Sequence, residues 1–430
     1  MMQEPHVLAA IDVGTTKVCT IVARKTGPAT FDVLAHSTVP CEGLKKGNVV
    51  DVEATRRAIR DSLTEVEKKA GIKIQSAYVG VTGAHVSYEN RWDSVGWAGE
   101  RGVITNDDLM RVPGVVANTS AKTGREVLHA IPMAYSLDGK RGIRNPVGMH
   151  TSNLKVESHV VTGAPSAVAK LVEAVRGAGI EVEALVLEPL ASSEAVLTPE
   201  EKQRGAVVAD IGGGTTDVVA FRHGSIYYTS VVPVGGYQFT NDISVTYNTP
   251  YEVAETVKLE HAHTEPHVVG PNEEVTLSVT GRTVKLRVSR RDICQITRER
   301  AQELVRLIKL KLQEAQIGDV ARVRLVLTGG SANLPGLREL VHRTLTSHVR
   351  IGVPEGHPSI PDELKSPKFS TPVGILLWGL QQHRPKESPA TSGNVPGTER
   401  GRNLIFSRLF RQIKELIPGG LLSAMQGRKS

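Results

Sequence analysis

Cysteine is scarce in this sequence. The three cysteines, Cys19, Cys41 and Cys294, lie far apart in the chain. Their number and spacing argue against a disulfide framework and against a Cys-x-x-Cys metal site. We therefore expect a protein of a reducing compartment.

Aromatic residues and long apolar runs are also rare. Phe, Trp and Tyr make up 4% of the chain, which argues against a stacking surface for single-stranded nucleic acid. No run of eighteen apolar residues predicts a membrane span. The N-terminal stretch MMQEPHVLAAIDVG lacks the basic and apolar regions of a signal peptide. With 40% hydrophobic and 23% charged residues over 430 positions, the composition predicts a soluble globular protein of two or more domains.

Positive charge is concentrated at the C-terminus. The net charge is +7, and residues 381–430 hold nine Lys or Arg against three Glu, nine minus three being +6. The preceding 380 residues are therefore nearly neutral. This distribution argues against a nucleic-acid-binding body and predicts that the tail contacts an anionic surface.

Two glycine-rich turns share one design. AAIDVGTTKVCTIVA (9–23) and VADIGGGTTDVVAF (208–221) each read as strand, Asp, glycine turn with two threonines, strand. Such a turn directs backbone N–H groups and hydroxyls at phosphate oxygens, and the aspartates would hold hydrated Mg²⁺. One turn alone is equally consistent with an ordinary hairpin, but two copies favour a triphosphate held between two similar lobes.

Other nucleotide signatures are absent. The sequence has no G-x-x-x-x-G-K-[ST] motif and no kinase H-R-D or D-F-G set, and RGAGIEVE lacks the third glycine of G-x-G-x-x-G. The paired turns are thus the principal nucleotide signal.

The motifs resemble those of the actin-like ATPase superfamily in identity and in order. IDVGTTK and DIGGGTTD resemble its two phosphate motifs, and LEPLASSEAVL and GGYQFTNDI resemble its two connecting segments. AETVK resembles its A-E-x-x-K helix and LTGGSANLPG its adenosine motif. The resemblance implies an α/β fold of the actin-like ATPase type, with two lobes and a nucleotide cleft.

Within that superfamily the chain resembles the FtsA family of bacterial cell-division proteins. The resemblance rests on GLKKGNVVDVEATRRAIRDSL, YVGVTGAHV and LHAIPMAYSLDGKRGIRNPVGM, and it implies an extra small subdomain, displaced from where actin would place one. The implied divisions are a first lobe of 1–83 and 164–196, rejoined by about 360–380; an inserted subdomain, 84–163; a second lobe, 197–359; a disordered linker, 381–401; a membrane-targeting helix, 402–417; and a tail, 418–430. Residues 261–275 match no family motif.

The resemblance also assigns roles to residues. It implies bound ATP and Mg²⁺, with Mg²⁺ held through water by Asp12 and Asp210. Glu188 matches a position linked to water activation, and a helix-start glutamate is the alternative. The residues implied in ATP binding are Asp12, Gly14, Thr15, Thr16, Lys17, Asp210, Gly212, Gly213, Gly214, Thr215, Thr216, Asp217, Gly235, Gly236, Glu255, Lys258, Gly329, Gly330 and Asn333. For Lys17 the alternative is an exposed hairpin lysine, and for Glu255 with Lys258 it is a surface ion pair.

The segment 402–417 has the pattern of an amphipathic helix. At 100° per residue, its large apolar residues other than Leu404 fall within an arc of about 140°, and Arg408, Arg411 and Lys414 lie outside it. This pattern predicts a helix lying in a membrane interface, and a helix docked on the protein itself or on a partner is the alternative. The residues expected to contact the membrane are Ile405, Phe406, Leu409, Phe410, Ile413, Leu416 and Ile417, with Arg408, Arg411 and Lys414.

The resemblance to FtsA implies an adaptor that binds ATP, self-associates into protofilaments and tethers FtsZ to the cytoplasmic face of the membrane at the division site. Such a protein would be at most a weak ATPase. Its expected partners are FtsZ, other copies of itself, anionic lipid and further division proteins through 84–163, with no nucleic acid. Two alternatives share the fold: a PilM-like pilus-assembly adaptor and a small-molecule kinase.

Overall fold

The computed structural model describes residues 7–382, apart from 28–29, 97–101, 121–123, 282 and 284. None of the helices within this part is both long and apolar enough to cross a bilayer. The expected linker, amphipathic helix and tail at 381–430 lie almost wholly outside it.

The first lobe is built on a five-stranded sheet in the order β11-β6-β1-β2-β3. β1 is antiparallel to β2 and parallel to β6. Because helices cover the sheet, β1 can be an almost continuous buried apolar run, VLAAIDV. The elements are β1 (Val7–Val13), β2 (Lys17–Lys25), β3 (Phe31–Pro40), the small pair β4 (Leu44–Lys45) and β5 (Asn48–Val49), α1 (Val52–Ala70), β6 (Ser76–Val81), α4 (Pro165–Gly177) and β11 (Glu181–Leu187).

The second lobe repeats this topology. Its sheet has the order β14-β13-β12-β17-β18, and β12 is antiparallel to β13 and parallel to β17. The weak sequence duplication thus reflects two sheets of one design, each beginning with a glycine-turn hairpin. The elements are α6 (Pro199–Arg204), β12 (Val207–Ile211), β13 (Thr216–Arg222), β14 (Ser225–Val232), β17 (Leu325–Thr328), α10 (Leu337–Thr344) and β18 (Val349–Ile351).

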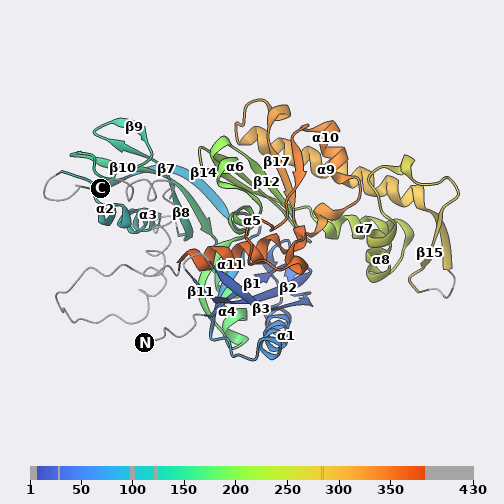
Figure 1. Ribbon diagram of the computed structural model, residues 1–430. Helices are drawn as coiled ribbons and strands as arrows, with labels where there is room; N and C mark the ends of the chain where they lie inside the picture. Colours follow the sequence, from blue (N-terminus) through green and yellow to red (C-terminus); the bar gives the residue numbers. More distant parts are fainter. Residues whose placement is uncertain are drawn as a thin grey trace.

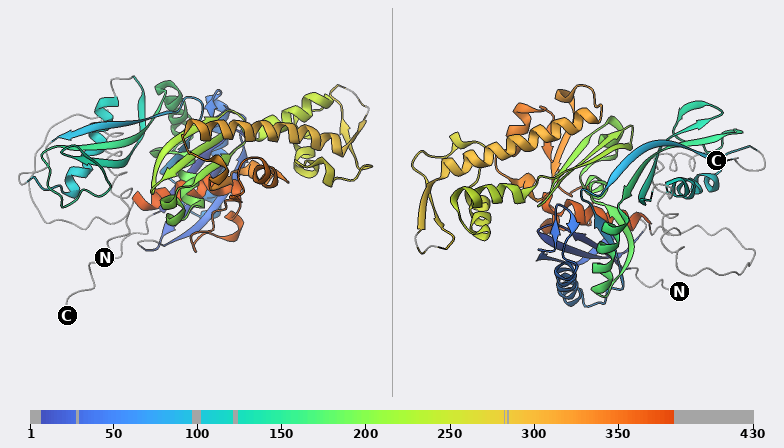
Figure 2. Two further views of the ribbon diagram at one scale, coloured as in Figure 1. Left: turned by 90° about the horizontal axis from the view of Figure 1, so that it is seen from above. Right: turned by 180° about the vertical axis from the view of Figure 1, so that it is seen from behind.

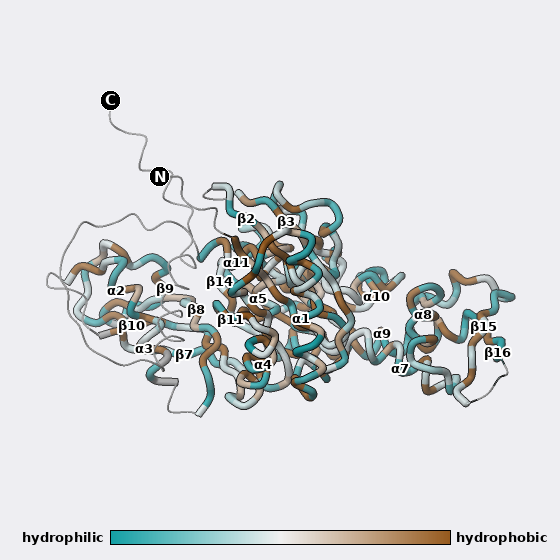
Figure 3. The backbone as a smooth tube through the Cα atoms, turned by 90° about the horizontal axis from the view of Figure 1, so that it is seen from below, coloured by the Kyte–Doolittle hydropathy of each residue, from teal (hydrophilic) through white to brown (hydrophobic). Residues whose placement is uncertain are grey.

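Two helices lie between the lobes. α5 (Glu188–Val196) and α11 (Ser370–Gln382) pack closely on each other, and α11 crosses the middle of the molecule (Figure 1). A Cβ atom on Gly374 would lie 1.8 Å from the carbonyl oxygen of Ala191, so α11 approaches α5 at a point where only glycine fits. Hydrophobic residues are concentrated in this central part of the molecule (Figure 3).

The insertion forms its own sheet, in the order β7-β10-β8-β9. It is not packed as a separate unit, because Leu128, Ile131 and Val161 are buried in the core of the first lobe. A smaller core of its own includes Leu109 and Val156. The elements are β7 (Ser87–Gly96), α2 (Asn106–Met110), α3 (Val112–Ser120), β8 (Glu126–Leu137), β9 (Lys140–Ile143) and β10 (Leu154–Gly163).

A second extension projects from the opposite end of the molecule (Figure 2). It consists of α7 (Gly236–Tyr247), α8 (Tyr251–His261), β15 (Glu274–Ser278), β16 (Lys285–Ser289) and the first part of α9 (Arg290–Glu314). The long α9 continues into the core of the second lobe through Ala301, Leu304 and Ile308. The segment 261–290, of which 261–275 match no family motif, thus comprises the outer hairpin of this extension and the turns leading into it.

Gly374→Ala should destabilise the protein by about 2 kcal/mol or more, because the added methyl group meets backbone and not a side chain that can turn away. Thermal unfolding measures this effect. Gly356→Ala is the matched control, since a Cβ there meets nothing within 4 Å and the backbone is not left-handed. Equal melting temperatures for the two variants would contradict the close contact between α5 and α11.

Candidate functional site

The two glycine-turn hairpins have the same backbone geometry. Gly14 N–H donates to Lys17 O at 2.9 Å, and Gly212 N–H donates to Thr215 O at 2.9 Å. The strand pairing is also equivalent, with Asp210 opposite Asp217 in one hairpin and Asp12 opposite a cysteine in the other. The second hairpin therefore carries two carboxylates where the first carries one.

The tips of the hairpins meet across the space between the lobes. A Cβ on Gly213 would lie 2.7 Å from the side chain of Thr16, and one on Gly214 would lie 2.5 Å from the hydroxyl of Thr15. Glycine is required at both positions because the opposing threonines occupy the space of a side chain. This close approach gives the GGG run a physical reason that the sequence alone did not supply.

A cavity of about 470 Å³ opens beside these tips. The structure brings most of the predicted residues together around it: Asp12, Gly14, Thr15, Thr16, Lys17, Glu188, Asp210, Gly212, Gly213, Gly214, Thr215, Asp217, Gly236, Glu255, Lys258, Gly329, Gly330 and Asn333. Two predicted residues do not line it. Thr216 is buried and donates to Val234 O at 2.8 Å, and Gly235 packs against the backbone of the second turn.

Four carboxyl groups gather on one side of the cavity. Asp12, Asp210 and Asp217 are 7%, 5% and 3% exposed. Burial, opposed by Lys17 and reinforced by Asp210, raises the pKa of Asp12 to about 7. Burial, opposed by a hydrogen bond from Thr82, raises the pKa of Asp217 to about 8. Such a cluster is electrostatically unfavourable when fully ionised, and a cation would relieve it.

The pKa values of the other two carboxyl groups, Asp210 and Glu188, are also raised. Burial raises the pKa of Asp210, against hydrogen bonds from Thr371 and Ser192. Burial, with the charges of Asp12 and Asp217, raises the pKa of Glu188 well above its usual value. Glu188 is the first residue of α5 and lies beside Gly80, whose missing side chain leaves room for it.

Two threonines from the first lobe hold aspartates of the second. Thr82 Oγ1 donates to Asp217 Oδ1 at 2.7 Å, and Thr371 Oγ1 donates to Asp210 Oδ2 at 2.8 Å. Both bonds are buried and join the lobes across the cleft. Neither threonine was predicted as a site residue, because neither lies in the paired glycine turns. Thr82 does directly follow strand β6, so its position at the end of a strand was a possible signal.

The far side of the cavity is formed by α7 and α8. Lys258 Nζ lies 2.7 Å from Glu255 Oε2 and donates to Thr240 Oγ1 at 2.9 Å, so this pair is partly buried and not a surface ion pair. Tyr237 and Tyr251 stack on each other with ring centroids 5.3 Å apart. Both line the cavity, and they were also missed by the sequence analysis.

The adenosine-like motif closes the cavity behind the second hairpin. Gly329 has φ +83°, and a Cβ there would lie 2.3 Å from Asp210 Oδ1. Ser331 Oγ donates to the carbonyl of Gly212 at 3.0 Å. Lys17 Nζ donates to Lys368 O at 2.9 Å, which places its charge on the wall of the cavity.

Within the described residues no group of three or more His, Cys, Asp and Glu is arranged to bind a metal ion directly. The three buried cysteines are free thiols. The predicted membrane-contacting residues of 402–417 lie outside the described part of the chain.

Comparison with known structures concerns the fold. The chain is similar to PilM in a structure described as the PilM–PilN type IV pilus biogenesis complex, with 19% identity, a TM-score of 0.61 and coverage of 87% of this chain and 98% of that one. It is also similar to MreB 5 of Spiroplasma citri bound to AMPPNP, with 15% identity, a TM-score of 0.51 and coverage of 87% and 96%. The fold is therefore that of the actin-like ATPases, as the motifs predicted.

Sequence comparison is more specific. Two family models match, one described as cell division protein FtsA over residues 207–374 and one as the SHS2 domain inserted in FTSA over 83–162. The chain is 33% identical to cell division protein FtsA of Pseudomonas aeruginosa, with coverage of 96% of this chain and 99% of the relative. It is 30% identical to cell division protein FtsA of Escherichia coli K12, with coverage of 87% and 91%. With its fold, its insertion and these matches over nearly the whole chain, the protein belongs to the FtsA family of cell division proteins.

Proposed function

We propose that this protein binds ATP with Mg²⁺ in the cavity between the lobes and acts in cell division as a polymerising membrane adaptor. The observation that carries the nucleotide site is the meeting of two identical glycine turns beside three buried aspartates. Membership of the FtsA family supports the role in division.

The residues present fit a nucleotide with its metal ion. Gly213 and Gly214 line the cavity where the hairpin tips meet, and threonine hydroxyls and turn N–H groups suit phosphate oxygens. Asp12 and Asp210 would hold Mg²⁺ through water, which offsets their mutual repulsion. Bound Mg²⁺ would neutralise phosphate charge. Glu255, Lys258 and the Tyr237–Tyr251 pair would border the ribose and base.

Glu188 is proposed to orient water at the phosphate end of the cavity. It reaches the cavity from the start of α5, among the aspartates. Burial and the neighbouring aspartates raise the pKa of this carboxyl well above its usual value, and a bound cation would lower it. We expect slow hydrolysis, with ATP acting mainly as a ligand for lobe closure.

The remaining parts of the proposal concern assembly. We propose that copies associate head to tail into protofilaments, since a heterologous contact that does not close propagates. The protein would tether FtsZ, contact other division proteins through 84–163, and lie on the cytoplasmic face of the membrane at the division site. A linker of about twenty residues with a reach of about 25 Å would let 402–417 find the lipid surface, and polymerisation would multiply weak anchors.

Asp210→Ala and Gly213→Val should each weaken ATP-Mg binding at least about tenfold, or about 1.4 kcal/mol. The first removes a partner of the metal-bound water, and the second puts a branched side chain into the space beside Thr16. Isothermal titration measures the affinity, and Asp61→Ala, on an exposed face of α1, is the control. Wild-type affinity in both cleft variants would refute the site.

Without nucleotide and Mg²⁺, the melting temperature should fall by a few degrees as the pH rises from 7 to 8.5. The pKa of Asp217, about 8 in the folded protein against 3.8 ordinarily, means that the folded protein binds a proton that the unfolded chain lacks, so stability falls as the pH rises toward the folded value and levels off above it. Asp217→Asn should flatten this slope, and saturating ATP-Mg should do the same for the wild type. A pH slope unchanged by Asp217→Asn would contradict the raised pKa.

Replacing Phe406 and Phe410 together by Glu should release the protein from anionic vesicles while ATP binding persists. Each large apolar side chain contributes at most about 1.5–3 kcal/mol when fully buried, and each basic residue near an anionic leaflet about 1 kcal/mol, so losing two aromatic anchors is decisive for one helix. Co-sedimentation measures binding. Leu404→Glu, outside the apolar arc, is the matched control. If the double variant pellets like the wild type, 402–417 is not the anchor.

A further inference from the structure

His129 belongs to the insertion but is buried in the core of the first lobe. It lies on β8, is 2% exposed, and contacts Trp378 of α11 edge-on at 5.9 Å between ring centroids. Its Nε2 accepts a hydrogen bond from the backbone N–H of Leu187 at 2.9 Å. Because Nε2 is the acceptor, the neutral ring carries its proton on Nδ1.

Leu187 is the residue at which β11 turns into α5. It occupies the N-cap position of α5, whose start has no side-chain cap, and Glu188 follows immediately. The bond from His129 therefore fixes the backbone one residue before a carboxylate of the cleft. A side chain of the insertion is thus hydrogen-bonded to the backbone at the start of α5.

A second hydrogen bond of the cleft lies next to the start of the insertion. Thr82, which donates to Asp217 at 2.7 Å, is followed directly by Gly83 and the first residues of the insertion. The base there is held firmly: His85 Nδ1 lies 2.8 Å from Asn48 Oδ1, and Arg125 donates to the carbonyl of His85 at 2.6 Å. The chain between Thr82 and this fixed base of the insertion is therefore short.

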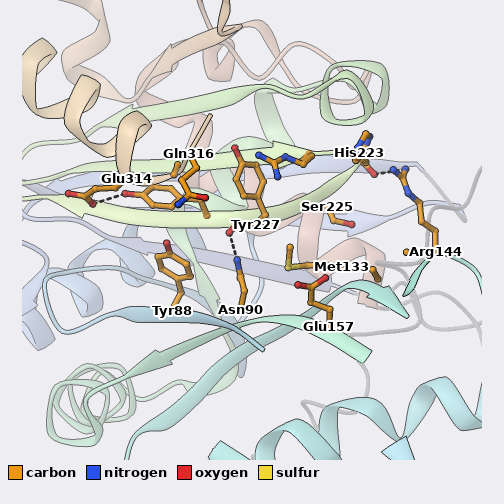
Figure 4. Close-up of a pocket in the computed structure, with 15 residues that line it drawn as sticks. Tyr88, Asn90, Met133, Arg144, Glu157, His223, Ser225, Tyr227, Glu314 and Gln316 are labelled. Atoms are coloured by element: carbon orange, nitrogen blue, oxygen red, sulfur yellow. Dashed lines mark hydrogen bonds between the residues drawn. The ribbon is translucent and has the colours of Figure 1, made fainter. Parts of the chain in front are cut away.

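The junction between the insertion and the second lobe contains a cavity. A cavity of about 590 Å³ separates β7 and β8 of the insertion from β14 and the end of α9, and Tyr88, Met133 and Glu157 face it from the insertion side (Figure 4). Hydrogen bonds at its edge include Asn90 Nδ2 to Tyr227 O at 2.8 Å and Arg144 Nη1 to His223 O at 3.0 Å. The insertion also packs on the second lobe beside this cavity, through Tyr88 against Tyr228 with ring centroids 5.3 Å apart and through His159 Nε2, 3.2 Å from Thr229 Oγ1.

We propose that His129 and Thr82 couple the insertion to the nucleotide cleft. His129 acts as a positioning residue for α5, and Thr82 ties the base of the insertion to Asp217. Closure of the lobes around ATP-Mg then alters the insertion, and whatever binds the insertion alters nucleotide affinity by the same factor. This inference rests on the proposed nucleotide site and adds to it the route by which the insertion responds.

Hydrogen–deuterium exchange with and without ATP-Mg tests the coupling. In the wild type, nucleotide should change exchange in β7, β8 and β10 as well as in the two hairpins. His129→Leu should abolish the change in the insertion and leave that in the hairpins, whereas His129→Gln, which keeps an acceptor, should restore at least half of it. His150→Gln is the control, because His150 is an exposed histidine of the same subdomain.

Thr82→Val provides an independent second variant of nearly the same shape, which also covers the case in which His129→Leu does not fold. It should at least halve the nucleotide-dependent change in the insertion. If both Thr82→Val and His129→Leu respond like the wild type, or if the wild-type insertion does not respond to bound nucleotide, the coupling is wrong. If titration detects no ATP-Mg binding by the wild type, the proposed function fails and the coupling with it.

Discussion

The contact between the two glycine turns is the constraint on which the rest of the structure depends. Gly213 and Gly214 face Thr16 and Thr15 so closely that neither position accepts a side chain. The helices between the lobes, α5 and α11, approach each other at Gly374 even more closely than the hairpins do at their tips.

This closeness concentrates negative charge. Three aspartates that would be independent in separate domains share one buried space, and the pKa values of Asp12 and Asp217 rise to about 7 and about 8. Hydrogen bonds from the hydroxyls of Thr82 and Thr371, each of which crosses to the other lobe, offset part of the free-energy cost of burying these carboxylates. Hydroxyl donors orient carboxylates without neutralising them, so the negative charge of the cluster is left for a cation to offset. The ATP-Mg proposed above would therefore also stabilise the folded protein.

The features that could be predicted from the sequence are local patterns, and those that could not depend on contacts between residues far apart in the chain. The hairpins, the order of motifs and the insertion were predictable because glycine turns, strand runs and family motifs are local patterns. Thr82, Thr371 and His129 were not, because their partners lie 135, 161 and 58 residues away and an isolated threonine or histidine carries no signal. For the same reason the sequence indicated an added subdomain but not that Leu128 and Val161 help to fill the core of the first lobe.

The two hairpins share their backbone but not their chemistry. At equivalent places the first has Lys17 and Cys19 where the second has Thr215 and Asp217. The first turn thus brings a positive charge beside one aspartate, and the second brings two aspartates with no lysine, so an anion and its cation would find unequal partners on the two sides. Asp217, the additional carboxylate, is also the one that Thr82 joins to the base of the insertion. The two lobes thus share one backbone design. Thr82, next to the inserted subdomain, is hydrogen-bonded to Asp217, the residue at which the two hairpins differ.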